Sequence, residues 1–156
     1  MTPAVKFLEK QGVTHTVHRY ELGESHAGTY GEAVANAIGA EPQRVFKTLI
    51  AQLDSGELVV AIVPVSSTLD LRALAAAASA KSAVMAPPQA AEGATGYVTG
   101  GISPFGQRKA LRTFVDRSLE NFPKVFVSAG RRGLQVEVGS KDLVGLCEGS
   151  VVALSE

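Results

Sequence analysis

The segment VFKTLIAQLDSGELVVAIVPV, residues 45–65, decides the fold. Its two apolar runs, 45–53 and 58–65, are rich in β-branched and aliphatic side chains, and the DSGE sequence between them is typical of a hairpin turn. The second run is apolar at almost every position, as expected of a strand covered on both faces. We therefore expect a central β-hairpin with helices packed against its sheet.

Helices are predicted before and after this hairpin in the chain. Thr2 is placed as the N-cap of a helix over residues 3–11, and Thr29 and Glu32 form a capping box that opens a helix ending at Gly39. The alanine-rich stretch 70–80 predicts a helix that covers the hairpin. Two further helices are expected, one after Pro87-Pro88 that ends at Gly93, and one capped by Ser140 that ends at residue 146.

Short strands are expected between these helices, at residues 14–20, 82–86, around Tyr97, 113–116, 124–128 and 134–138. The order of strands and helices is irregular and does not repeat a strand-helix-strand unit. That order predicts one α+β domain over residues 1–156, with a mixed and strongly curved sheet and helices outside it. A doubly wound parallel sheet is the less favoured alternative.

Composition restricts the function. Of the 156 residues, 46% are hydrophobic, and 15 basic residues balance 15 acidic ones, so we expect no DNA binding through bulk charge, and any RNA contact to be local. The single cysteine allows no internal disulfide. No apolar run approaches the roughly 20 residues that cross a bilayer, and the N-terminal residues lack the apolar run of a signal peptide. We therefore expect a cytoplasmic protein with no membrane partner.

Lys47 is the most informative single residue. Strand alternation places this lysine in an apolar row. That row contains Val45, Leu49, Ala51 and Leu53. A lysine in such a row extends to the rim, pairs with a carboxylate, or faces a cavity where a ligand supplies negative charge.

Two glycine-containing segments could approach a ligand. Residues 95–106 include four glycines and a proline, a composition that suits either close backbone contact with a ligand or two ordinary tight turns. Residues 128–133 join two predicted strands. There Ser128 offers a hydroxyl, and Arg131 and Arg132 suit a phosphate or are simply solvated.

Other catalytic patterns are absent from the sequence. There is no P-loop, no G-x-G-x-x-G and no G-x-S-x-G motif. His15 and His18 fall on opposite faces of a predicted strand, and Cys147 has no second cysteine or histidine nearby, so a metal site is disfavoured. His26, in a predicted loop, is the histidine most able to meet a ligand.

Four segments together resemble a known family. They are MTPAVK at residues 1–6, VFKTLI at 45–50, TGYVTGGISPFG at 95–106 and VSAGRRGL at 127–134. In this order and spacing, and over nearly the whole chain, they resemble the YbaK/EbsC family of aminoacyl-tRNA editing proteins, and within it the YbaK-type Cys-tRNA(Pro) deacylases. The resemblance implies a mixed, mostly antiparallel, barrel-like sheet surrounded by helices, with a pocket for the 3′-terminal aminoacyl-adenosine.

The resemblance also implies site residues. Lys47 matches the functional lysine of the family, and the loop containing Gly101 is expected to stabilise an oxyanion through backbone N–H groups. Gln135 stands where the family often has an acid, and Glu137 is only a weak substitute two residues further on. The positions that match the lining of the family's substrate pocket are Tyr20, Tyr30, Thr48, Gly100, Ile102, Ser103, Ser128 and Gly130.

In the reaction that the resemblance implies, the thiol of the substrate's own cysteine attacks its ester carbonyl, expels the ribose hydroxyl of the tRNA, and leaves a thiolactone. The protein then needs no nucleophile, metal or organic cofactor. The implied partners are the aminoacylated 3′ end of tRNA and prolyl-tRNA synthetase. Two alternatives remain open: an alanine-specific editing hydrolase that uses water, and a non-catalytic module that binds tRNA ends or a synthetase.

Overall fold

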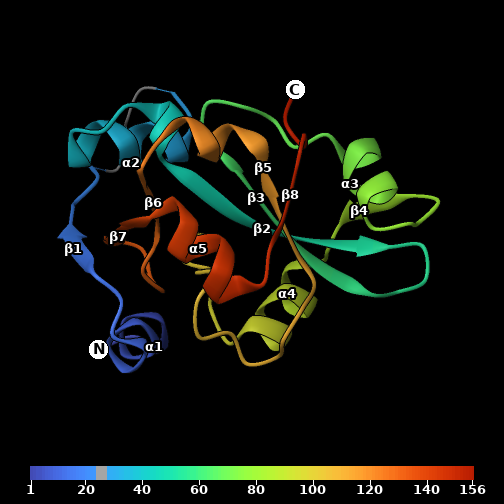
Figure 1. The fold of residues 1–156 in the computed structure, drawn as a ribbon, viewed down its shortest axis with the longest axis horizontal. Helices are drawn as coiled ribbons and strands as arrows, with labels where there is room; N and C mark the ends of the chain where they lie inside the picture. The colour runs from blue at the N-terminus through green and yellow to red at the C-terminus, as the bar shows by residue number, and fades with distance from the viewer. Residues whose placement is uncertain (24–27) are drawn as a thin grey trace.

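The predicted hairpin lies inside a five-stranded sheet. In the computed structural model, which describes residues 1–23 and 28–156, β2 (Phe46–Leu53) pairs antiparallel with β3 (Leu58–Pro64). The strand order is β4-β2-β3-β5-β8, and β5 and β8 are added in parallel (Figure 1). The three other strands of this sheet are β4 (Ala83–Met85), β5 (Thr113–Asp116) and β8 (Ser150–Val152). His26 lies outside the described residues.

A second sheet is antiparallel and has the order β1-β7-β6. Its strands are β1 (His15–Arg19), β6 (Lys124–Ser128) and β7 (Leu134–Gly139). A single parallel bridge between Val45 and Phe126 connects the two sheets. The expected α+β architecture with mixed strands is confirmed, but the sheets are not closed into a barrel, because this one bridge is the only strand pairing between them within the described chain.

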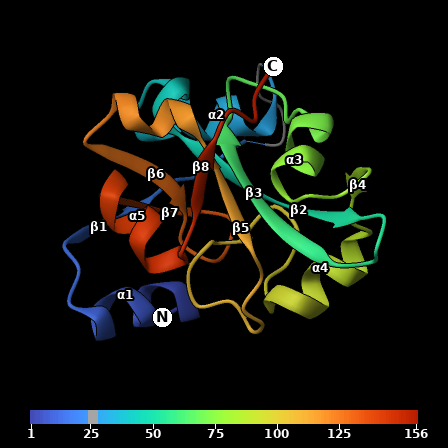
Figure 2. The same cartoon turned by 45° about the vertical axis from the view of Figure 1, so that its right-hand side comes forward.

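Helices surround the sheets (Figures 1 and 2). Leu74 of α3 packs with Ala51 and Val63 on one face of the hairpin, whereas Leu8 of α1 belongs to the larger core that contains Ile62 from the other face. The helices are α1 (Pro3–Gln11), α2 (Tyr30–Ile38), α3 (Leu71–Ala77), α4 (Pro88–Thr95) and α5 (Ser140–Cys147), with 3₁₀ turns η1 (Pro42–Arg44) and η2 (Arg117–Asn121). Within the described ranges, no helix combines the length and apolarity needed to span a bilayer.

The predicted helix caps at the N-terminal end of the chain are confirmed. The Thr2 hydroxyl accepts from the amide of Val5, and the Thr29–Glu32 capping box is complete. Gly39 ends α2 in the left-handed conformation with φ 71°. The capping box matters for the site because it fixes the first turn of α2, where Tyr30 begins the helix.

Three local predictions in the second half are wrong. Helix α4 continues through Gly93 to Thr95 and ends at Gly96, and no strand forms at Tyr97, whose hydroxyl instead donates to the Phe105 carbonyl. Ser140 is the first residue of α5 and does not cap it. Its hydroxyl donates to the Phe122 carbonyl, which holds the helix start against the preceding turn.

Candidate functional site

A cavity of about 370 Å³ lies along one edge of β2. Its walls come from β2 itself, the first turns of α2, the segment joining β4 to α4, the glycine loop, and the ends of β6 and β7. The residues that line it are Thr29, Tyr30, Gly31, Val34, Val45, Phe46, Lys47, Thr48, Leu49, Ile50, Val65, Met85, Ala86, Pro88, Ala91, Thr99, Gly100, Ile102, Ser128 and Gln135.

Strand pairing explains why this edge of β2 is open. Val65 donates to the Val45 carbonyl, so the odd-numbered residues of β2 use their main-chain groups toward β3. The N–H and C=O of Thr48 and Ile50 therefore point to the opposite edge. There β4 pairs with β2 only from Ala51 onward, and the Ile50 carbonyl accepts from the Ala86 amide. The peptide groups of Thr48 consequently face the cavity side of the strand.

Lys47 brings a cation to the cavity without a counter-ion from the described chain. Residues 1–23 and 28–156 place no carboxylate oxygen within 4.0 Å of its ammonium. Its side chain is half-buried, and this desolvation lowers the pKa of Lys47 because burial disfavours the charged form. Of the three environments considered for Lys47, a cavity that accepts a ligand agrees with this geometry, and an ion pair with the described residues does not.

Two buried side-chain oxygens of the lining have no hydrogen-bond partner among residues 1–23 and 28–156. They are Oγ1 of Thr48 and Oε1 of Gln135, on side chains that are 8% and 7% exposed. A buried acceptor left unpaired costs about 1–3 kcal/mol. Hydrogen-bond donors on a ligand would remove this cost, so the cavity wall suits a polar molecule.

The two adjacent glycines differ in their relation to the cavity. Gly100 lines it, whereas Gly101 does not, and the Gly101 amide donates to the Val98 carbonyl at 2.9 Å. A Cβ on Gly100 would lie 2.5 Å from Nε of Arg132, and a Cβ on Gly101 would lie 2.7 Å from Cα of Arg131. Close packing against the backbone of the neighbouring turn therefore requires glycine at 101, whereas at 100 the contact is with the end of the flexible Arg132 side chain and the φ of 92° favours glycine. The Gly101 amide is already used within its own turn.

The other predicted site residues separate into two groups. Tyr20 and Ser103 do not line this cavity: the Tyr20 hydroxyl lies 3.1 Å from that of Tyr30, and Ser103 is fully buried with its Oγ accepting from the Phe105 amide. Gly130 is also outside the lining, and its amide donates to the Ser128 hydroxyl. The predicted residues that the cavity does bring together are Tyr30, Lys47, Thr48, Gly100, Ile102 and Ser128.

Sequence reasoning missed part of the wall. Gly31, Met85 and Ala86 line the cavity but belong to no recognisable motif. Gly31 carried one usable signal, a glycine in the first turn of a helix, where it costs helix stability. A Cβ there would lie 2.7 Å from Val65, so this glycine allows α2 to approach the end of β3.

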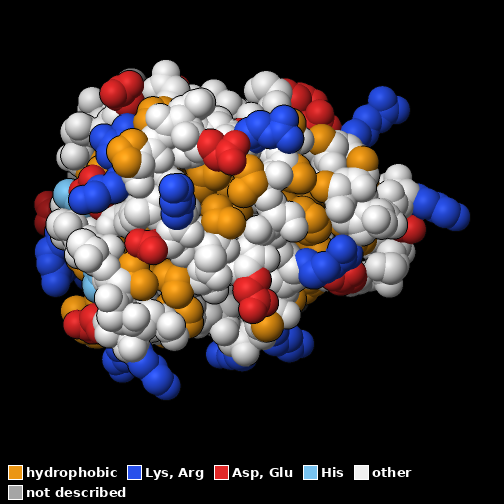
Figure 3. Space-filling model, viewed as in Figure 1, with side chains coloured by type: hydrophobic (Ala, Val, Ile, Leu, Met, Phe, Trp, Pro, Cys, Tyr) orange, Lys and Arg blue, Asp and Glu red, His pale blue; other side chains and the backbone are white. Residues whose placement is uncertain are grey.

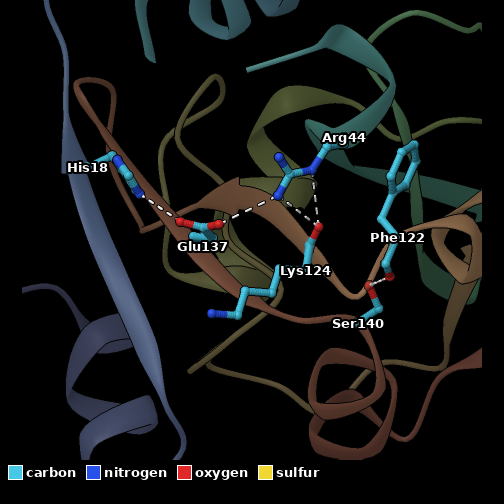
Figure 4. A network of polar contacts seen from close by, with 6 residues as sticks. All are labelled: His18, Arg44, Phe122, Lys124, Glu137 and Ser140. Carbon is cyan, nitrogen blue, oxygen red and sulfur yellow. Dashed lines mark hydrogen bonds and ion pairs between the residues drawn. The ribbon is translucent and has the colours of Figure 1, made fainter. Parts of the chain in front are cut away.

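Glu137 is engaged away from the cavity, in a network shown in Figure 4. Its carboxylate oxygens lie 3.1 Å from Nε2 of His18 and 3.5 Å from the Arg44 guanidinium. Arg44 also donates to the Lys124 carbonyl and lies over the ring of Phe126. The geometry assigns Glu137 to cross-strand support of β1, β7 and η1, and Gln135 is the residue of β7 that lines the cavity.

The lining offers few groups for covalent or acid-base chemistry. Among the described residues that line the cavity, none is Cys, His, Asp or Glu. Cys147 lies elsewhere, where its thiol donates to the Pro104 carbonyl and burial raises its pKa to about 12. No group of three His, Cys, Asp or Glu suited to a metal ion occurs in the part of the chain that the structure describes. The arrangement can hold and polarise a ligand, and its described lining offers no thiol and no His, Asp or Glu to activate a hydroxyl.

Comparisons with known proteins give a consistent result. Residues 24–146 match the family model of the aminoacyl-tRNA editing domain. A protein of Enterococcus faecalis (strain ATCC 700802 / V583), provisionally named Cys-tRNA(Pro)/Cys-tRNA(Cys) deacylase EbsC, is 32% identical over 99% of this chain and 93% of its own length.

Solved structures share the fold. A structure described provisionally as a trans-editing enzyme for prolyl tRNA synthetase superposes with a TM-score of 0.82 at 24% identity, covering 100% of this chain and 99% of its own. The hypothetical protein APE2540 superposes with a TM-score of 0.87 at 21% identity, covering 99% of both chains.

Proposed function

We propose that this chain, which belongs to the family of aminoacyl-tRNA editing domains, is a deacylase that releases cysteine from mischarged Cys-tRNA(Pro). The observation that carries the proposal is the cavity beside β2, in which Lys47 has no carboxylate partner among the described residues and no described lining residue is Cys, His, Asp or Glu. Such a site suits a substrate that brings its own negative charge and its own nucleophile.

The nucleophile is the thiol of the cysteinyl ester. Its sulfur attacks the ester carbonyl, the bond to the ribose oxygen breaks, and the ribose hydroxyl leaves with the thiol proton. The products are free tRNA and a four-membered thiolactone, which water opens to cysteine. Holding the thiol against the carbonyl contributes up to about 7–11 kcal/mol in favourable intramolecular reactions, so positioning is the main task of the protein.

Negative charge develops on the carbonyl oxygen of the ester during this attack. Lys47 contributes a cation in a partly desolvated site, where electrostatic stabilisation is stronger than in water. Main-chain N–H groups at the cavity supply the second contribution: Thr48 presents its peptide group at the open edge of β2, and Gly100 lies in the lining. The Gly101 amide must leave the Val98 carbonyl before it can take part.

Selectivity for the tRNA comes from a partner. Fifteen basic residues balance fifteen acidic ones, and both signs are interspersed on the face shown in Figure 3. Affinity for tRNA through phosphate contacts alone is therefore modest and salt-sensitive. We propose prolyl-tRNA synthetase as the protein that presents the mischarged tRNA.

Deacylation assays test the assignment. Purified protein is mixed with Cys-tRNA(Pro) or Ala-tRNA(Pro), and the released product is identified by mass. We expect rapid loss of cysteine, slow loss of alanine, and a decrease on the order of 100-fold in the cysteine reaction for Lys47→Ala. Lys141→Ala, which removes an exposed lysine on α5, is the matched control. Preferential release of alanine would assign the water-dependent reaction instead, and release of neither amino acid would leave only tRNA binding.

A further inference from the structure

A second hollow adjoins the cavity at Tyr30, which lines both. Its volume is about 560 Å³, and its wall includes two phenols, a guanidinium and several peptide groups. The residues of this second hollow are Tyr20, Glu21, Leu22, Gly23, Tyr30, Arg132 and Gly133. A ligand that filled the first cavity and extended past Tyr30 would enter it.

Contacts between distant segments hold the wall of the second hollow. The hydroxyls of Tyr20 and Tyr30 lie 3.1 Å apart, and the Tyr20 amide donates to the Gly133 carbonyl at 3.0 Å. The Arg132 guanidinium carbon lies 4.9 Å from the ring centre of Tyr30. On its other side Arg132 packs so closely on Gly100 that a Cβ there would collide with it. These contacts preorganise the guanidinium between the two hollows.

The charge of Arg132 is available to a ligand. Arg132 is exposed, and no carboxylate of residues 1–23 or 28–156 lies within 4.0 Å of it, including that of Glu21 in the same hollow. A guanidinium presents a planar set of donors that matches the oxygens of a phosphodiester. Phenol rings such as those of Tyr20 and Tyr30 provide surfaces on which an unpaired base stacks.

We propose that the second hollow is a binding subsite for the RNA nucleotide that precedes the terminal adenosine. Arg132 binds the phosphodiester that links the two nucleotides, and the preceding base lies against Tyr20 and Tyr30. The proposal rests on the proposed function, since it assumes that the terminal aminoacyl-adenosine occupies the first cavity. It explains why one tyrosine is shared by the two hollows.

The experiment compares two cysteinyl esters that differ in the nucleotides preceding the terminal adenosine. Cysteinyl-adenosine lacks the linking phosphodiester, whereas the cysteinyl-CCA trinucleotide contains it. We expect Arg132→Ala to lower the ratio of kcat/KM for the trinucleotide to kcat/KM for the nucleoside by on the order of tenfold. Arg132→Lys, which keeps the charge without the planar donors, should give an intermediate ratio. Arg72→Ala removes an equal charge from an exposed position on α3 and is the control.

Salt dependence gives an independent readout. Loss of one phosphate contact should reduce the slope of log kcat/KM against log salt concentration by about 0.7 for the trinucleotide. If Arg132→Ala lowers kcat/KM by the same factor for both esters, Arg132 only supports Tyr30 and the subsite is overturned. If Arg132→Ala changes kcat/KM for neither ester, the subsite is overturned as well.

Binding separates this proposal from the deacylase assignment. If the wild type cleaves neither ester, the affinity of unacylated CCA trinucleotide relative to adenosine is measured for wild type and Arg132→Ala. A preference for the trinucleotide that Arg132→Ala abolishes supports the subsite although deacylation fails, and the absence of that preference refutes it.

Discussion

Lys47 connects stability to function at the scale of one residue. Desolvation lowers the pKa of Lys47, and no described carboxylate compensates the buried charge. A side chain retained at such a cost is typical of a functional site. Thr48 and Gln135 repeat the pattern as buried oxygens without partners, so the unpaired polar groups of the described chain gather largely at this cavity.

We predict that Lys47→Met lowers activity without lowering the stability of the fold. Methionine keeps the aliphatic stem and removes the charge, so the free energy of unfolding should stay within about 0.5 kcal/mol of the wild type or rise, while kcat/KM for Cys-tRNA(Pro) falls. The pKa of Lys47 is lower in the folded state than in the unfolded state. The buried ammonium therefore lowers the free energy of unfolding by its full amount at pH values below the folded-state pKa. Between the two pKa values the unfolded state binds more protons, and wild-type stability rises with pH.

Urea unfolding of wild type and Lys47→Met across this pH range measures the effect. The difference in stability between the two proteins should narrow as pH rises toward the unfolded pKa of lysine, about 10.4. A difference that is constant with pH, or a large loss of stability in Lys47→Met at neutral pH, would show that Lys47 is paired in solution and has a structural role.

At the scale of elements, the glycine loop and the turn at residues 131–132 form one packed unit. We predict that Gly101→Ala destabilises the protein by about 1–3 kcal/mol, because its Cβ would lie 2.7 Å from Cα of Arg131 and backbone cannot yield easily. Gly93→Ala is the matched control: this glycine lies inside α4 with open space around it, and alanine there should stabilise by about 0.5–1 kcal/mol.

Thermal or urea unfolding of the two alanine variants decides the matter. Opposite signs are expected from the same chemical change. A stability for Gly101→Ala equal to that of the wild type would mean that the loop separates from the turn at residues 131–132.

Elements specified by nearby residues were predictable from sequence, and those specified by distant contacts were not. The hairpin and the caps at Thr2, Thr29 and Gly39 follow from local chemistry, and each is present. Helix α4 passes Gly93 and ends at the left-handed Gly96, and the hydroxyl of Tyr97 in the irregular backbone that follows donates to the Phe105 carbonyl, a contact that no local pattern reveals. Strand β8 exists through its parallel pairing with β5, and its three residues carry too little pattern to be recognised.

The cavity shows the same division. Strand alternation singled out Lys47, and the motifs pointed to Thr48 and Ser128, which share the lining. The wall that Met85 and Ala86 form arises because β4 pairs with β2 only from Ala51 onward, and this strand register is set in three dimensions. Motif similarity also grouped Gly101 with Gly100, although packing against the turn at residues 131–132 gives the two glycines different positions.

At the scale of the whole molecule, charge balance limits what the protein recognises alone. A net charge of zero gives little long-range attraction to tRNA, so we propose that selection comes from the 3′-terminal nucleotides and from a partner. The terminal nucleotides are the same in every tRNA. On the proposed function the cavity distinguishes the aminoacyl group, and neither it nor the second hollow distinguishes one tRNA body from another.

We predict that tRNA selectivity depends on prolyl-tRNA synthetase. Unassisted protein should deacylate Cys-tRNA(Pro) and Cys-tRNA(Cys) at rates within a few-fold of each other, because both present the same terminal nucleotides and the same thiol. Addition of prolyl-tRNA synthetase should favour Cys-tRNA(Pro) by about tenfold or more, since tethering replaces the missing electrostatic affinity with a high effective concentration.

Single-turnover deacylation of both tRNAs, with the synthetase titrated, measures the ratio of the two rates. Catalytically inactive synthetase controls for aminoacylation during the assay, and cysteinyl-tRNA synthetase controls for a generic synthetase effect. Strong discrimination without any synthetase would place a recognition surface for the tRNA body on this chain, contrary to what its balanced charge predicts.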